Sequence, residues 1–76
     1  RAESSIAAID AGLSLLKPRG IMSLIIYYGR DTGYAERDAL LAYLRTIDHR
    51  AFTVVVADFC NRPNDPPLPV FIIKDA

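Results

Sequence analysis

Two short stretches carry the residue types best suited to hold a ligand. Tyr27-Tyr28-Gly29-Arg30 directly follows an apolar run, and Asn61, Asn64, Pro66 and Pro67 fall just before another. Asparagine side chains both donate and accept hydrogen bonds, as reading the edge of a base requires. Tyrosine rings can stack on an extruded base, and prolines hold the backbone in place before a ligand arrives. The two stretches together predict a binding site.

The predicted substrate-binding set combines an aromatic ring, a cation, two amides and two backbone-shaping residues: Tyr28, Gly29, Arg30, Asn61, Asn64 and Pro66. Glycine permits close approach of the backbone or a positive φ, and the guanidinium of Arg30 can grip a phosphate. Each position also has a purely structural explanation. Tyr27 and Tyr28 would pack beneath helices as strand-end aromatics, and the asparagines would hydrogen-bond their own turns.

The other reactive side chains point to structural roles. Cys60 invites a nucleophile interpretation, but a partly buried structural thiol is favoured, and a single cysteine excludes an internal disulfide. His49 is the one histidine and is expected in a surface turn, so no metal site is predicted. Asp58 is not assigned to either side of its strand. No catalytic residue can be named from the sequence.

Composition limits the classes of protein that need to be considered. The chain has 76 residues, a formal net charge of zero and 51% hydrophobic residues. Neutral charge argues against a self-sufficient nucleic-acid-binding module. No apolar stretch reaches the length of a membrane span and no signal peptide is visible, so a cytoplasmic protein is expected. Continuous apolar runs suit strands covered on both faces, which needs more chain and indicates a piece of a larger protein.

Apolar periodicity and turn residues predict the elements. A first helix is expected to be capped by Ser4 or Ser5 and to end at Pro18 and Gly20, with an apolar face of Ile6, Ile9, Leu13 and Leu16. A second helix, capped by Asp31 or Thr32, is expected over 34–47, with Leu40, Leu41, Leu44 and Ile47 inside. Strands are expected at 21–28, 52–59 and 70–74.

The order helix-strand-helix-strand-strand predicts an α/β fold. Two strands joined by a helix are expected to be parallel neighbours, whereas the last two strands, with no helix between them, are expected to pair antiparallel. This is the architecture of the C-terminal half of a Rossmann-like class I S-adenosylmethionine-dependent methyltransferase sheet. Residues 1–76 are accordingly interpreted as the C-terminal part of a single methyltransferase domain.

The sequence resembles one family in particular, the bacterial proteins long labelled rRNA methylases and assigned to methylation of 5-aminomethyl-2-thiouridine at the tRNA wobble position. The resemblance covers essentially the whole chain and rests on Ser5-Ile6-Ala7-Ala8-Ile9, Leu15-Leu16-Lys17-Pro18-Arg19-Gly20, Ile26-Tyr27-Tyr28-Gly29, and Asn61 with Asn64, Pro66 and Pro67. The family usually has histidine where this chain has Arg30. Guanidinium stays protonated, so Arg30 cannot take over proton handling.

The resemblance implies that S-adenosylmethionine is bound mainly by an N-terminal half that this chain lacks, so the chain alone is expected neither to bind it well nor to catalyse. It implies the anticodon region of tRNA and the missing half as partners, allows a homodimer, and involves no membrane. One alternative is a non-catalytic structural or interaction fragment. Another is an amino-methyltransferase on DNA or protein that uses Asn64-Asp65-Pro66-Pro67; the place of that motif before the last strand argues against it.

Overall fold

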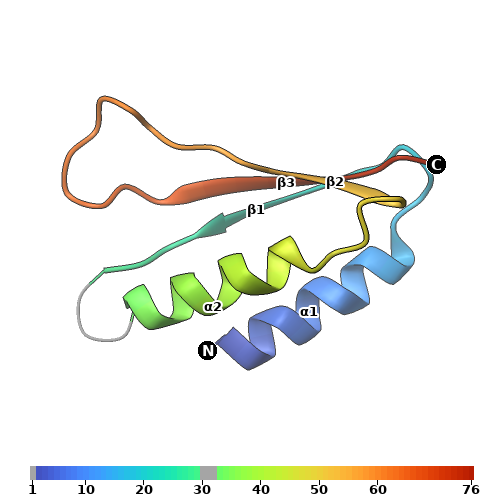
Figure 1. Cartoon of the computed structure of the whole chain (residues 1–76), viewed down its shortest axis with the longest axis horizontal. Coiled ribbons are helices and arrows are strands. Elements are labelled where there is room, and N and C mark those ends of the chain that lie inside the picture. The colour runs from blue at the N-terminus through green and yellow to red at the C-terminus, as the bar shows by residue number, and fades with distance from the viewer. Residues whose placement is uncertain (1, 30–32) are drawn as a thin grey trace.

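The computed structural model describes residues 2–29 and 33–76 and has two layers, a pair of helices and a three-stranded sheet (Figure 1). The elements are α1 (Ala2–Leu15), β1 (Ile21–Ile26), α2 (Gly33–Arg45), β2 (Phe52–Val56) and β3 (Leu68–Lys74). The predicted order of elements and the α/β class are confirmed. Arg30, which was predicted to bind substrate, and Asp31 and Thr32, which were predicted to cap α2, lie outside the described residues.

The sheet has the order β1-β3-β2, with β3 antiparallel to both neighbours. The predicted antiparallel pairing of the last two strands is confirmed. The prediction that the two helix-linked strands are neighbours is wrong, because β3 lies between them. Residues 57–67 form a long connection that carries the chain back along the sheet, and β3 there satisfies the backbone groups of both flanking strands. β1 and β2 still run in the same direction, so both end at one edge of the molecule.

Both helices pack on one face of the sheet, and the core lies between the two layers (Figure 1). Strand alternation turns Leu68, Val70 and Ile72 of β3 toward the helices, and all three are buried. The helices meet them with Ile9, Leu13, Leu40 and Leu44, as periodicity predicted. Ile6, Leu16, Leu41 and Ile47 are partly buried against this core.

The opposite face of the sheet is apolar and exposed. Register places Phe71 between Ser23 of β1 and Val55 of β2, and all three side chains point away from the helices. The same face carries the exposed side chains of Ile21 and Ile25. The helices cover one face only, so the prediction that these strands are covered on both faces depends, as stated above, on chain beyond these 76 residues and stays a prediction.

Several element boundaries differ from the predicted ones for identifiable reasons. Ser4 and Ser5 lie inside α1, not at its cap, because the helix already runs from Ala2. After α1, the left-handed residue is Arg19, with φ 66°, and not Gly20. Gly20 is needed for space instead, because a Cβ there would lie 2.9 Å from the carbonyl oxygen of Lys17.

β3 begins earlier than predicted and includes Pro69, although proline is rare inside a central strand. The Pro69 carbonyl accepts a hydrogen bond from the amide of Ala57, just past the end of β2. The amide and carbonyl of one strand residue point to the same side. An amide at position 69 would therefore point, like the Pro69 carbonyl, to the chain just past the end of β2. The proline therefore removes no ladder bond to β2.

Candidate functional site

The site lies at the edge where β1 ends and β3 begins, since Ile26 is paired with Leu68. Tyr27, Tyr28 and Gly29 leave the sheet at this edge, beside the segment that brings the chain into β3. Carboxyl ends of strands in open α/β sheets are where ligand crevices form. The two predicted stretches are therefore brought to the same end of the molecule.

Alternation separates the two tyrosines, as predicted. Tyr27 continues the open face of the sheet and is 74% exposed, whereas Tyr28 points to the helix side and is half-buried against the core. Its ring lies 5.7 Å from that of Tyr34, edge to face, a favourable arrangement of two aromatic quadrupoles. Tyr34 comes from the first turn of α2.

The guanidinium of Arg37 lies against both of these rings. The Cζ atom of Arg37 lies 4.8 Å from the centroid of Tyr28 and 5.1 Å from that of Tyr34, within the range of cation–π attraction. Tyr34 and Arg37 are three residues apart on α2 and so share one face of the helix. Arg37 is also paired with Asp38 at 2.9 Å. Its planar cation is thus held at the rim of the site with its charge only partly balanced by an exposed carboxylate.

The connection before β3 reaches this group through one side chain. The hydroxyl of Tyr34 donates a hydrogen bond to a carboxylate oxygen of Asp65. This bond, with Asp65 as a nearby negative charge, raises the pKa of Tyr34 above its usual value. We call the four side chains that meet here, Tyr28, Tyr34, Arg37 and Asp65, the rim cluster.

Two glycines, Gly29 after β1 and Gly33 at the start of α2, are required for different structural reasons. Gly29 has φ 113°, a conformation that side chains rarely adopt, so the turn after β1 requires glycine. Gly33 is needed for space, because a Cβ there would lie 2.8 Å from the backbone of Tyr28. The second glycine lets α2 begin directly against the end of β1, and this close approach brings Tyr34 to Tyr28.

The predicted second stretch lies in an exposed connection. Asn61 is exposed in the turn at residues 60 and 61, and Asn64 is exposed with φ 65°. Pro66 is half-buried where the chain approaches β3. Asp58 is also exposed. The structure therefore brings Tyr28 and Gly29 to one edge of the molecule together with residues 62–65, which we call the Asn64 segment. Asn61 lies further out on the same connection.

Two expectations about reactive side chains can now be compared with the structure. His49 is exposed in the turn before β2, as predicted. Cys60 is exposed as well, so the expectation of a partly buried thiol is wrong; the strand that was predicted to reach Phe59 ends at Val56 and leaves residue 60 in an open turn. Within residues 2–29 and 33–76, no three histidine, cysteine or acidic side chains are grouped so as to hold a metal ion.

Sequence reasoning missed Tyr34, Arg37 and Asp65. Tyr34 and Arg37 were passed over because they fit the polar side of an amphipathic helix. Their three-residue spacing directly behind a glycine-flanked loop is the signal that could have found them. Asp65 was noticed only as part of a motif, and its role depends on a contact with a residue that is distant in sequence.

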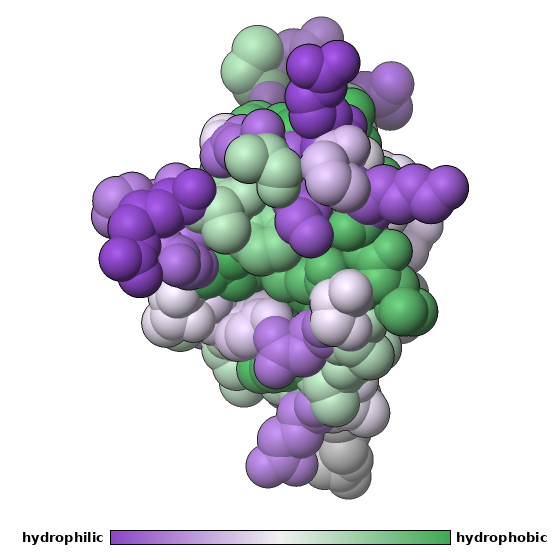
Figure 2. All heavy atoms as spheres, turned by 90° about the vertical axis from the view of Figure 1, so that its right-hand side faces the viewer, coloured by the Kyte–Doolittle hydropathy of each residue, from purple (hydrophilic) through white to green (hydrophobic). Residues whose placement is uncertain are grey.

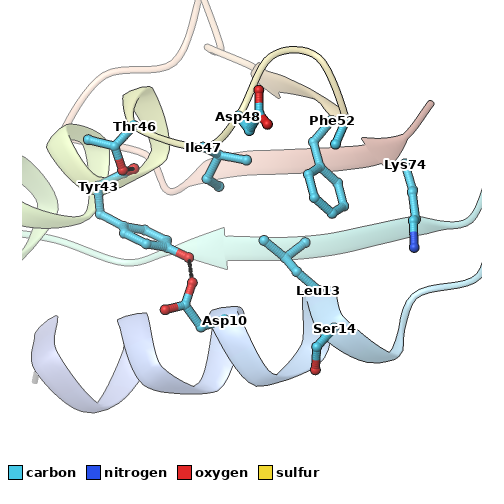
Figure 3. A pocket seen from close by; sticks show the side chains of 10 residues that line it. Asp10, Leu13, Ser14, Tyr43, Thr46, Ile47, Asp48, Phe52 and Lys74 are labelled. Atoms are coloured by element: carbon cyan, nitrogen blue, oxygen red, sulfur yellow. Dashed lines mark hydrogen bonds between the residues drawn. The ribbon is translucent and has the colours of Figure 1, made fainter. Parts of the chain in front are cut away.

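A hollow with a volume of about 490 Å3 lies at the opposite end of the sheet, between α1 and the start of β2 (Figure 3). Figure 2 looks at this end and shows apolar surface between hydrophilic side chains. The polar groups of the hollow already have partners within the chain. The hydroxyl of Tyr43 donates to Asp10, and Lys74 Nζ donates to the carbonyl of Leu16. Asp48 accepts hydrogen bonds from Arg50.

The surroundings of Tyr43 change the pKa of its phenol. Burial, and then the hydrogen bond to Asp10, raises the pKa of Tyr43 from 10.0 to about 12. Since no described residue of the two predicted stretches lines this hollow, we place the candidate functional site at the rim cluster. Among the described residues, neither helix has the length and apolar content needed to cross a bilayer.

Comparison with known proteins identifies the family. The model of the family described as "Putative rRNA methylase" matches residues 1–73. A crystal structure described as a putative rRNA methylase from Clostridium thermocellum is 40% identical to this chain with a TM-score of 0.92. The alignment covers 97% of this chain and 40% of that one.

Two further crystal structures are similar. One is described as a putative methyltransferase from Streptococcus mutans in complex with SAH, with 32% identity, a TM-score of 0.86, and coverage of 97% of this chain and 40% of that one. The other is described as an rRNA methylase from Streptococcus thermophilus, with 36% identity, a TM-score of 0.81, and coverage of 95% of this chain and 40% of that one. This chain thus spans 40% of the length of the solved structures that it matches, and it belongs to the family described as "Putative rRNA methylase".

Proposed function

We propose that this chain is the C-terminal part of an S-adenosylmethionine-dependent methyltransferase domain whose complete form methylates RNA. Membership of the family supports the reaction class, and one similar structure is described as a complex with SAH. The observation that carries the proposal furthest is the rim cluster. It gathers two aromatic rings and a guanidinium at the strand ends, beside a connection with two asparagines.

The open face of the sheet is consistent with this division of the domain. β1 has β3 on one side only among the described strands, and the apolar side chains opposite the helices are exposed. We propose that the remaining part of the domain covers this face and supplies the glycine-rich loop and the acidic residue that bind S-adenosylmethionine. The described residues include no such loop, so no step of the cofactor chemistry is assigned to them.

Within the complete domain, this chain would hold the base that receives the methyl group, which S-adenosylmethionine supplies when bound. An aromatic ring such as Tyr28 offers a face for stacking. The amides of Asn61 and Asn64 offer donors and acceptors for the edge of a base. Arg37 offers a cation for a phosphate or for stacking. The contribution of these groups is orientation of the substrate rather than covalent chemistry.

As substrate we propose the aminomethyl group of wobble 2-thiouridine in tRNA, with the anticodon region as the bound segment. An exocyclic amine can attack a sulfonium methyl group directly, so no nucleophilic side chain is required. This agrees with an exposed Cys60 that lies outside the rim cluster. A second candidate is ribosomal RNA, because the family and two of the similar structures are described as rRNA methylases.

A methyl-transfer assay on the full-length protein separates these candidates. Tritiated S-adenosylmethionine is supplied with tRNA that carries unmethylated 5-aminomethyl-2-thiouridine, or with ribosomal subunits, and the labelled nucleoside is identified by mass spectrometry. We expect label on the wobble nucleoside of tRNA. Label on ribosomal RNA alone would replace tRNA by the second candidate. Label on neither RNA would support a non-catalytic structural piece.

A further inference from the structure

The connection between β2 and β3 is exposed over most of its length, yet its second half has a defined conformation. Residues 58–65 are all exposed. Asn64 and Asp65 both have positive φ, 65° and 54°. Asparagine and aspartate adopt left-handed φ more readily than other residues with a Cβ, but usually as single residues, so two in succession are unusual, and the proline that follows further restricts Asp65. Such a local conformation persists only where the surroundings hold it.

The contact that holds it is the hydrogen bond from Tyr34 to Asp65, which joins this connection to the first turn of α2. Tyr34 is itself held from two sides, by the ring of Tyr28 at 5.7 Å and by the guanidinium of Arg37 at 5.1 Å. The hydroxyl therefore has a fixed position from which to donate. A phenol is protonated at neutral pH in any case, and the bond to Asp65 raises the pKa of Tyr34 further.

We propose that the Tyr34–Asp65 hydrogen bond is a latch that fixes the Asn64 segment beside the end of β1 before the RNA substrate binds. Tyr34 and Asp65 are thus positioning residues, and the groups placed against the substrate remain Tyr28 and Asn64. The benefit is a smaller entropic cost on binding, since a connection that is already ordered loses less freedom when a ligand docks. This inference rests on the proposed function for the identity of the ligand, but the latch itself has a readout that does not.

Three variants separate the hydrogen bond from other effects. Tyr34→Phe keeps the ring contacts with Tyr28 and Arg37 and deletes only the donor. Asp65→Gly keeps a residue that accepts positive φ and deletes the acceptor. Asp65→Asn is the matched control, because asparagine tolerates left-handed φ and its side-chain oxygen can still accept the bond from Tyr34.

The first measurement is 15N relaxation of the backbone amides in the full-length protein, over residues 60–65, because these exposed amides have little protection from hydrogen exchange to lose. We expect order parameters of about 0.85 in the wild type and below about 0.6 in Tyr34→Phe and Asp65→Gly. Asp65→Asn should remain near the wild type. Melting temperatures of all variants should stay near that of the wild type, because both positions are exposed.

The second measurement is steady-state methylation of tRNA. We expect Tyr34→Phe and Asp65→Gly each to raise the KM for tRNA about tenfold, with the KM for S-adenosylmethionine unchanged. The double variant should lose no more than either single variant, because both changes break the same bond. A general weakening of the fold would raise both KM values together and would lower the melting temperature.

Each result decides one of the two claims. Unchanged order parameters in Tyr34→Phe overturn the latch, and so do losses that multiply in the double variant. Lower order parameters with an unchanged KM for tRNA overturn its role in positioning. If the wild-type protein transfers no methyl group to either RNA, the proposed function fails instead, and the relaxation measurement then decides by itself whether Tyr34 fixes the Asn64 segment.

Discussion

Two adjacent residues of β3 provide a direct test of whether the open face of the sheet is covered in the complete protein. Phe71 and Ile72 point to opposite faces. Ile72 is 0% exposed beneath the helices, whereas Phe71 is 40% exposed on the open face. Replacing each by threonine keeps a residue that suits a strand. The comparison therefore reports the surroundings of each side chain more than the strand propensity.

The expected magnitudes follow from these exposures. For Ile72→Thr, truncation in a packed core costs about 2–5 kcal/mol. For Phe71→Thr the cost depends on what covers the ring. Burying a large apolar side chain completely is worth about 1.5–3 kcal/mol. A ring that remains 40% exposed therefore loses only about 1–2 kcal/mol on truncation. A ring that is fully covered loses about 3–5 kcal/mol.

The assay is urea unfolding of the full-length protein, with the free energy of unfolding and the m-value fitted for each variant. We expect the two variants to be destabilised by similar amounts, about 3 kcal/mol or more. Lys17→Ala, at an exposed position in the turn after α1, is the control and should change stability by about 0.5 kcal/mol or less. A small loss for Phe71→Thr beside a large loss for Ile72→Thr would refute the covered face, and with it the interpretation of this chain as one part of a larger sheet.

Three further predictions concern single side chains. Asn64→Gly, which preserves the positive φ, and Asn61→Ala are expected to lower methylation by the full-length protein at least tenfold, the value of one well-placed hydrogen bond, with melting temperatures unchanged. Cys60→Ser is expected to leave turnover unchanged, and a large loss would restore the nucleophile interpretation of this exposed thiol. The pKa of Tyr43 is raised from its ordinary value of 10.0 to about 12 in the fold. Its contribution to stability is therefore full below pH 10.0 and lost as the pH rises through about 12. Absorbance titration should show one tyrosine that ionises at this high pH, Tyr43→Phe should abolish that step, and a midpoint near 10 would contradict the burial of the phenol and its hydrogen bond to Asp10.

The helices and the identity of the strands were predictable because they depend on local pattern. The spacing of Leu40 and Leu44 needs only the helical period, and both are buried as predicted. The place of β3 was not predictable from element order, because the rule that helix-linked strands are neighbours does not consider a later strand that inserts between them. The signal available in the sequence was the continuous apolar run Val70-Phe71-Ile72-Ile73, which suits a central strand. In the structure, Leu68, Val70 and Ile72 form the most buried row of the sheet.

At the site, the sequence singled out two stretches that the structure brings to one end of the molecule, but not the contacts that join them. Tyr28 and Asn64 were predicted from their chemistry, and both lie at the expected edge of the sheet. Tyr34, Arg37 and Asp65 were missed because their roles arise from pairing across a long sequence separation. Such pairing depends on the close approach of α2 to the end of β1, which the space at Gly33 permits. A glycine at the start of a helix does not by itself indicate which side chains it brings together.

The prolines before β3 were predicted to hold the connection still, and the structure limits what they can do. Pro66 and Pro67 restrict the chain only where it enters the sheet, and both are half-buried there. Asn64 and Asp65, before them, adopt left-handed backbone, which asparagine and aspartate tolerate better than other residues with a Cβ, but usually as single residues. Prolines do not favour two such residues in succession, and the proline after Asp65 restricts it further. The hydrogen bond from Tyr34 is the contact from outside the connection that holds this conformation. The order of the Asn64 segment is therefore a tertiary property, set by the junction of β1 and α2, and its loss in Tyr34→Phe is the consequence by which this reasoning stands or falls.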